Sequence, residues 1–321
     1  MPVNIRTMNK KTVLSLSCAS LTLLLMLIST AAWAADVFTL ETAQTAAAKG
    51  NPQAAYFLGK QYAGGQGVPQ DYVRAAEYYR QAATQGYAFA QNNLGVLYAK
   101  GLGVKQDYAE AAQWYCRAAE QGDSLAEYSM GRIYSIGRGV PQNMTEALKW
   151  YHRAAAQNQP DALTALGDLY MFGGQGVQVN YAEAYKFYTN AVAQGRSDCL
   201  NSLGVIYENG YGDVQKNPEM AVKCFRQAAG KKDGRAQMNL GRMYKDGTGV
   251  EKDPVEAYKW FTLSLRNGTA MARHYLEEMN GASPLVKIHL TPEQIDEALR
   301  RVDDYIQSTK GLPIPEKTAG K

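Results

Sequence analysis

The sequence has few of the residues from which catalytic and metal centres are usually built. Its 321 residues include three histidines and four cysteines, and the motifs H-E-x-x-H, G-x-S-x-G and C-x-x-C do not occur. Ser-x-x-Lys is also absent, although a serine β-lactamase needs a lysine at that spacing to help activate its serine. We therefore expect no enzyme, no metal and no cofactor. A hydrolase of cell-wall or β-lactam substrates is the disfavoured alternative.

Phenylalanine is scarce as well. The chain has 7 phenylalanines against 22 tyrosines and 30 glycines. A globular core normally prefers Phe and Ile, whereas tyrosine keeps its hydroxyl at a wet edge. This composition favours a thin, two-layer structure over one large globule.

The N-terminus has the three parts of a secretory signal peptide. Arg6, Lys10 and Lys11 form a basic region, residues 13–28 form an apolar run, and Ala32-Trp33-Ala34 matches a cleavage site. We predict that residues 1–34 are removed and that the protein is exported, to the periplasm or beyond the cell. An uncleaved anchor is the alternative, because residues 13–35 are just long enough to span a bilayer. Cys18 lacks a convincing lipobox.

The basic charge belongs mostly to that signal. Removing its three basic residues from the 34 Lys and Arg leaves 31, against 30 Asp and Glu. A mature chain that is nearly neutral does not predict nucleic-acid binding, which needs a concentrated basic face.

A short motif, Leu/Met-Gly-x-x-Tyr, recurs six times at intervals of 36 or 37 residues. Its glycines are Gly59, Gly95, Gly131, Gly167, Gly204 and Gly241. We place six repeats at 51–86, 87–122, 123–158, 159–195, 196–232 and 233–268. A period of this length is typical of solenoids, in which each unit buries its apolar face against its neighbours.

Each repeat is predicted to be a helix, a turn and a second helix. In the first helix a small residue, a Leu and a Tyr follow at spacings of four, which places them on one face. The recurring glycine costs about 1 kcal/mol of helix propensity relative to Ala, so we expect a neighbouring helix to approach too closely for a Cβ. Gly-x-Gly-Val forms the turn. Asp or Asn then caps the second helix, at Asp71, Asp107, Asn143, Asn180, Asn217 and Asp253.

The segments outside the repeats are predicted to close the stack. Residues 40–50 resemble the last turns of a second helix, and residues 35–50 are predicted to form an N-terminal capping helix. Residues 269–310 hold a half repeat and a C-terminal helix, which begins with the capping box Thr291-Pro-Glu-Gln. Its predicted apolar face is Ile295, Leu299, Val302 and Ile306. Residues 311–321 form a disordered tail.

The mature chain keeps an odd number of cysteines, Cys116, Cys199 and Cys224. An odd number does not make a complete disulfide framework. Cys199 and Cys224 replace an Ala and a Trp of the repeat, at positions too far apart to bond. We expect free thiols or packing variants.

The pattern A-x-x-x-L-G-x-x-Y, G-x-G-V, D/N, A-x-x-W/Y-Y and A-A resembles the Sel-one-like repeat, a relative of the tetratricopeptide repeat. The resemblance covers about residues 51–276. It implies an all-α, right-handed α-solenoid and a role as an adaptor or scaffold. Exported bacterial members are associated with signalling, envelope assembly, motility and host interaction. The cysteine pairs of the family's cysteine-rich branch are missing here.

The resemblance also implies a binding surface. If the small residue of the first helix is position 4, positions 6 and 10 point away from the core face and vary between repeats. In related superhelices this face lines the concave groove. The candidate partner-binding residues are Tyr56, Lys60, Asn92, Tyr128, Arg132, Asn201 and Arg242. Asn amides would bond a peptide backbone, and Tyr and Arg are frequent hot-spot residues.

We therefore expect a protein or peptide partner, no nucleic acid, and no membrane contact apart from an uncleaved anchor. The alternatives for the surface are a solvated helix face without a partner, a stable structural component of the envelope, and a secreted factor that interacts with a host.

Overall fold

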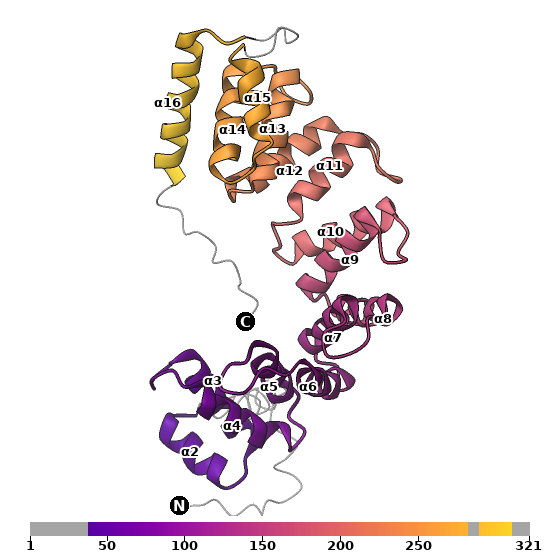
Figure 1. The fold of residues 1–321 in the computed structure, drawn as a ribbon, viewed down its shortest axis with the longest axis vertical. Coiled ribbons are helices and arrows are strands. Elements are labelled where there is room, and N and C mark those ends of the chain that lie inside the picture. Colours follow the sequence, from indigo (N-terminus) through magenta and orange to yellow (C-terminus); the bar gives the residue numbers. More distant parts are fainter. Residues whose placement is uncertain (1–37, 282–288, 310–321) are drawn as a thin grey trace, which may run out of the picture. The chain divides into compact units, whose positions relative to one another are not determined.

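The computed structural model describes residues 38–281 and 289–309, and these residues form fifteen α-helices (Figure 1). The predicted signal peptide and tail, residues 1–34 and 311–321, lie outside the described residues. The helices are α2 (Leu40–Ala48), α3 (Pro52–Gly64), α4 (Tyr72–Ala83), α5 (Ala88–Lys100), α6 (Tyr108–Glu120), α7 (Ser124–Ile136), α8 (Met144–Ala156), α9 (Pro160–Phe172), α10 (Tyr181–Ala193), α11 (Leu200–Asn209), α12 (Pro218–Gly230), α13 (Gly234–Asp246), α14 (Pro254–Arg266), α15 (Ala272–Met279) and α16 (Pro292–Thr309). The predicted all-α solenoid of helix–turn–helix repeats is confirmed.

The second helix of every repeat begins where the sequence indicated. Each of the six predicted Asp and Asn caps accepts a hydrogen bond from one or two backbone N–H groups of the first turn. Pro218 and Pro254 occupy the first helical turn, where no intrahelical N–H is needed. These caps fix the start of each helix by purely local interactions.

The first helices end in the glycine turns. In five repeats the first turn glycine has a positive φ and the left-handed conformation, at Gly65, Gly101, Gly137, Gly210 and Gly247. Gly173 ends α9 differently, with φ 68° and ψ −158°, in a turn that has one more residue than most of the others. A single antiparallel bridge between Gly174 and Val177 closes that longer loop.

The recurring helical glycines lie against aromatic rings of the second helix. A Cβ on any of the six would lie less than 3.0 Å from a ring carbon of Tyr79, Tyr115, Tyr151, Tyr188, Phe225 or Phe261. Side-chain contacts that short are essentially never observed. The glycine lets the ring pack directly on the backbone of the first helix, so the two helices of a repeat approach closely.

The chain divides into two units, residues 1–85 and 86–321. In the first, α2 packs against α3, and α3 packs against α4. The Gln81 side chain of α4 donates to the Ala47 carbonyl at 2.6 Å, which ties the last turn of α2 to the repeat. Phe38 packs against Phe57 with ring centroids 5.9 Å apart. Within the range predicted for the N-terminal helix, residues 35–50, the structure has α2 over Leu40–Ala48.

In the second unit each helix from α5 to α14 packs against the next one along the chain (Figure 1). The buried residues form successive clusters: Leu166 lies in one centred on α8 to α11, and Leu240 lies in another built from α11 to α14 and α16. A row of joints of this kind, with no shared centre, is what makes the structure a solenoid.

In three repeats a side-chain hydrogen bond also joins the end of the second helix to the first helix. A Gln or Asn at the end of the second helix donates to a Gln or Glu of the first helix, 30 residues earlier. The pairs are Gln121 with Gln91 (2.7 Å), Gln157 with Glu127 (2.8 Å) and Asn267 with Gln237 (2.8 Å). Because the acceptor residues Gln91, Glu127 and Gln237 are buried, the bonds satisfy polar atoms that would otherwise be left without a partner.

The C-terminal helix α16 packs along α14. The predicted capping box is present, since the Thr291 hydroxyl accepts from the backbone N–H of Gln294 at 3.3 Å and the Gln294 side chain accepts from the backbone N–H of Thr291 at 3.0 Å. One predicted apolar position is wrong: Leu299 is exposed and Ala298 is buried in its place, whereas Val302 is buried as predicted. Tyr305 of the same helix packs edge-on against Trp260, with ring centroids 5.2 Å apart.

The three cysteines of residues 38–309 are free, as expected. Cys199 and Cys224 are buried and Cys116 is half-buried. None of the described helices is long and apolar enough to cross a membrane.

Candidate functional site

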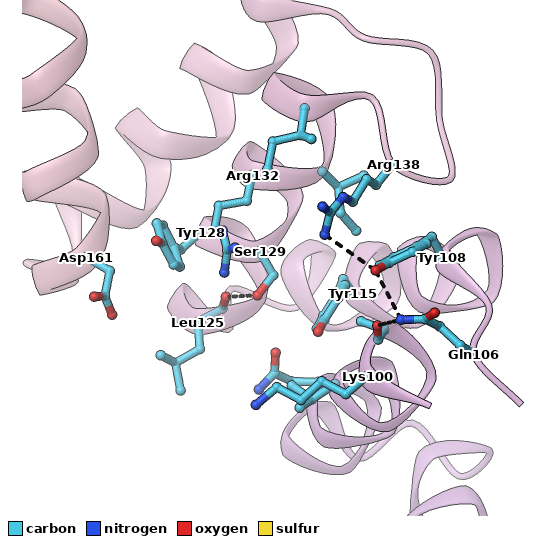
Figure 2. Close-up of a pocket in the computed structure, with 15 residues that line it drawn as sticks. Lys100, Gln106, Tyr108, Tyr115, Leu125, Tyr128, Ser129, Arg132, Arg138 and Asp161 are labelled. Carbon is cyan, nitrogen blue, oxygen red and sulfur yellow. Dashed lines mark hydrogen bonds between the residues drawn. The ribbon is translucent and has the colours of Figure 1, made fainter. Parts of the chain in front are cut away.

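The second unit contains a recess of about 430 Å³ lined by residues of three consecutive repeats. Side chains from α5, α6 and α7 and from the turns that follow α5 and α7 line it, together with Asp161 at the start of α9 (Figure 2). The recess therefore lies on the side of the repeats formed by first helices and turns, which is the side that the sequence assigned to a partner.

Three of the predicted site residues meet in this recess. Asn92 belongs to α5, and Tyr128 and Arg132 belong to α7. The Arg132 guanidinium lies over the Tyr128 ring, with Cζ 5.9 Å from the ring centroid. Cation–π contact of this kind holds the charged group beside an aromatic surface and leaves its N–H donors available.

The other four predicted residues lie elsewhere. Tyr56 and Lys60 belong to the first unit, where the Lys60 ammonium lies 5.8 Å from the Tyr56 ring centroid. Asn201 accepts from the Asn239 amide at 3.0 Å, and the Arg242 guanidinium donates to Glu208 at 2.7 Å. Both of these residues are thus already paired within the chain.

The expectation that position 6 points away from the buried face is wrong at two of the four candidates that occupy this position. Asn92 is 7% exposed and Asn201 is 8% exposed. A helical wheel treats each helix in isolation, whereas in the stack the first helix of the next repeat lies beside position 6. The Asn201–Asn239 hydrogen bond between α11 and α13 is direct evidence of that contact. Position 6 therefore lies at the joint between repeats.

Tyrosine hydroxyls in the recess stay protonated at neutral pH. Burial raises the pKa of Tyr128 to about 12, against a smaller lowering by Arg132. Burial also raises the pKa of Tyr115, although Arg132 and Ser129 oppose the shift. These hydroxyls can act as hydrogen-bond donors but not as bases under physiological conditions.

Hydrogen bonds to Tyr108 connect the turn residues Gln106 and Arg138, which also line the recess. The Tyr108 hydroxyl oxygen accepts from the Gln106 amide at 3.1 Å and from the Arg138 guanidinium at 3.4 Å (Figure 2). The same Gln106 amide donates to the Ala99 carbonyl at 2.9 Å, which fixes the turn after α5. Arg138 also lies over the Tyr108 ring, with Cζ 5.3 Å from the centroid.

The charge of the lining is mainly positive. Lys100, Arg132 and Arg138 face a single carboxylate, Asp161, and that carboxylate is paired with Arg196. Neither Arg132 nor Arg138 forms an ion pair with a carboxylate in the described part of the chain. The recess therefore favours an anionic group.

Two exposed apolar side chains border the recess. Leu125 is 51% exposed and Ile136 is 50% exposed, and both belong to α7. Exposed apolar side chains that cluster at a recess are typical of interaction sites.

Sequence reasoning missed the residues that the turns contribute. Gln106 and Tyr108 flank the cap of α6, and Arg138 is the variable residue of a Gly-x-Gly-Val turn. The signal was present, because the residue between the two glycines differs among repeats just as position 10 does. The predicted site drew on variation in the helices alone.

The recess lining contains no histidine or cysteine and a single carboxylate, Asp161. Within residues 38–281 and 289–309 no group of three His, Cys, Asp or Glu side chains could hold a metal ion. His152, on α8, packs against Tyr170 and Phe187, and burial lowers its pKa below the ordinary value. Its position between aromatic rings is that of a packing residue.

Comparison with known proteins supports this description. The Sel1 repeat family model matches residues 52–87, 88–123, 124–159, 160–195, 197–233 and 234–269. A Sel1 repeat protein from Oxalobacter formigenes is 32% identical over 80% of this chain and 96% of its own, with a TM-score of 0.64. No match was found among curated protein sequences.

A second similar structure is that of a protective antigen of uropathogenic Escherichia coli strains with an SLR fold. It is 28% identical, with a TM-score of 0.58, over 84% of this chain. The matched part spans 63% of that protein's length.

Proposed function

Because the chain belongs to the Sel1 repeat family, whose members generally serve as scaffolds for protein interactions, we propose that it binds a protein partner through the first-helix side of its second unit. The contact is centred on the recess between α5, α6 and α7, and the chain itself carries out no chemistry.

The observation that supports this proposal most is the composition of the recess. It combines exposed apolar side chains, aromatic rings and arginines without carboxylate partners, which is the mixture found at hot spots of protein interfaces. Its lining comes from three consecutive repeats, so a partner segment can contact several units at once.

We propose further that binding takes place outside the cytoplasm. The N-terminal signal pattern supports export, and the nearly neutral mature chain suits a protein that recognises a partner by shape and local charge. The mass of the purified protein tests this: an N-terminus at Ala35 and release by osmotic shock are expected. Membrane sedimentation of a chain that retains residues 1–34 would show an anchored protein instead.

Site-specific photocrosslinking in the native cell tests the binding surface. A photoreactive phenylalanine is placed at Leu125 or Ile136, which border the recess, or at Gln113 or Lys223, which are exposed on second helices. We expect discrete protein adducts from the first pair only. Adducts from the second pair alone, or from neither pair, would show that the recess is not the interface.

A further inference from the structure

Asn92 carries an unsatisfied hydrogen-bond acceptor in the wall of the recess. The side chain is 7% exposed, and its Oδ1 atom is buried without a donor among the described residues. A buried acceptor left unpaired is costly, because its hydration is lost without compensation. The atom is therefore placed to accept a hydrogen bond from a group that the chain does not supply.

The equivalent position in another repeat shows what is missing. Asn201 occupies the same repeat position as Asn92, and its Oδ1 accepts from the Asn239 amide at 3.0 Å. Ser129 stands in repeat three where Asn239 stands in repeat six, but its hydroxyl donates to the Leu125 carbonyl at 2.9 Å. At the joint between repeats five and six, Asn239 donates to the buried acceptor. At the joint between repeats two and three, the equivalent residue Ser129 donates to its own helix, so Asn92 receives no hydrogen bond from it.

Hydrogen-bond donors that no acceptor of the described chain engages also lie in the recess, although one N–H of Arg138 donates to Tyr108. Arg132 and Arg138 each lie over a tyrosine ring and form no ion pair with a carboxylate in the part of the chain that the structure describes. The Tyr108 oxygen accepts from two N–H groups, so its own proton points to no acceptor within the described ranges. Guanidinium and phenol donors together suit a carboxylate.

We propose that the recess holds an extended segment of the partner protein that carries an Asp or Glu side chain. On binding, the Asn92 side chain turns toward the recess and its Oδ1 accepts from a backbone N–H of that segment, and the carboxylate accepts from Arg132 or Arg138 and from the Tyr108 hydroxyl. Neighbouring apolar side chains pack on Leu125 and Ile136. This inference rests on the proposed function and adds the chemical class of the ligand.

A passing segment fits this recess better than a chain end. The lining residues belong to repeats two, three and four, so the recess follows the direction in which the repeats succeed one another. A bound segment would continue along the first helices on either side of its acidic residue, whereas a C-terminal carboxylate would use only one end of the lining.

An array of blocked octapeptides tests the ligand class. Each N-acetylated, C-amidated peptide is made with Asp, Asn or Lys at position four and with Leu, Ile or Val beside it, and the whole mature protein is the probe. We expect the best Asp peptides to bind about tenfold more tightly than their Asn counterparts, which corresponds to about 1.4 kcal/mol. Equal binding of Asp and Asn peptides would overturn the inference.

A matched set of variants tests whether Arg132 and Arg138 cause the preference for Asp peptides over Asn peptides. Arg132→Gln combined with Arg138→Gln should remove the preference for Asp. Arg117→Gln should keep it, because Arg117 also lies over an aromatic ring, Trp114, but outside the recess. Preserved preference in the double variant, with an unchanged circular dichroism spectrum, would refute the assignment.

Asn92→Leu tests the backbone contact separately. It should weaken binding of the best Asp peptide about tenfold, and should change little for the same peptide N-methylated at the bonded amide. Equal losses for both peptides would contradict a hydrogen bond to Oδ1. A further array, with Asn at position four and a free C-terminus, tests whether the recess binds a C-terminal carboxylate. Tighter binding there than to blocked Asp peptides would overturn the proposal of an internal acidic residue.

Crosslinking separates failure of this inference from failure of the proposed function. The adduct from Leu125 should disappear in the Arg132→Gln, Arg138→Gln background. An adduct that persists at full yield would leave the proposed function intact and reject the acidic ligand. The absence of an adduct in the parent protein would reject the proposed function itself.

Discussion

The glycine of the first helix is the position where one methyl group should harm this fold most clearly. We consider Gly241→Ala in α13. Alanine is the better helix former by about 1 kcal/mol, so an isolated helix would gain stability. In the folded chain, however, the new Cβ would lie 2.7 Å from Cε1 and 2.8 Å from Cδ1 of Phe261.

The size of the effect follows from how little Phe261 can move. Carbon atoms in ordinary contact lie about 3.5–4.0 Å apart, so the ring would have to shift by about 1 Å. Phe261 is fully buried, and it stacks on Tyr275 with ring centroids 4.6 Å apart. Overpacking a well-packed site costs about 1–3 kcal/mol. Taking the upper end and subtracting the gain in helix propensity, we expect a net destabilisation of about 2 kcal/mol.

Thermal unfolding followed by circular dichroism measures the effect. For a chain of this size 1 kcal/mol corresponds to about 2–4 °C, so the midpoint should fall by about 4–8 °C. Hydrogen exchange should increase first in α13 and α14, because solenoid stability is local.

Gly230→Ala is the matched control, because Gly230 is helical and no atom lies within 4 Å of its added Cβ. Its midpoint should stay the same or rise. Phe261→Leu should partly rescue Gly241→Ala, so that the double variant loses less than the sum of the two single variants. A midpoint for Gly241→Ala at or above that of the parent would refute the view that ring packing on the backbone requires a glycine at this position.

Three further predictions concern buried polar groups. Asn92→Leu should leave the thermal midpoint unchanged or higher, because it removes an unpaired buried acceptor; a clear drop would show that the amide is paired in the free protein. Alkaline titration should destabilise the fold between pH 10 and about 12, because the pKa of Tyr128 is raised to about 12 and the unfolded tyrosine ionises first; a thermal midpoint that stays constant over this range would contradict this. At neutral pH a thiol reagent should modify Cys116 first, since burial raises the pKa of Cys199 to about 12 and of Cys224 to about 11; simultaneous modification of all three would argue against it.

Much of the fold could be predicted from the sequence because its determinants are local. An Asp or Asn cap acts within the first turn of its own helix, as Asp107 does with the backbone N–H groups of Ala109 and Glu110. A turn glycine such as Gly101 needs only its own φ of 67°. Such features repeat with the motif, so six near-copies identify them without knowledge of tertiary contacts.

The candidate site was predicted only in part because it depends on neighbouring repeats. Asn92 and Asn201 occupy the same position of the motif and are both buried, but one is unpaired and the other is bonded to Asn239. That difference is decided by a residue 37 or 38 positions away, in another copy of the motif. The position of Arg138 in the recess likewise depends on its contact with Tyr108, which belongs to the preceding repeat.

This dependence also explains why one part of a repetitive structure would be selected for binding. Repeats five and six complete their own joint: Asn239 bonds to Asn201, and Glu208 pairs with Arg242. At the corresponding joint between repeats two and three, Ala99 stands where a carboxylate partner for Arg132 would be needed, and Ser129 is turned toward its own helix. The same positions of the motif meet at both joints, so the polar groups left unpaired distinguish them. If so, exchanging Ser129 for Asn should close the recess joint as it is closed in repeat six, and the Leu125 crosslink should be lost without unfolding.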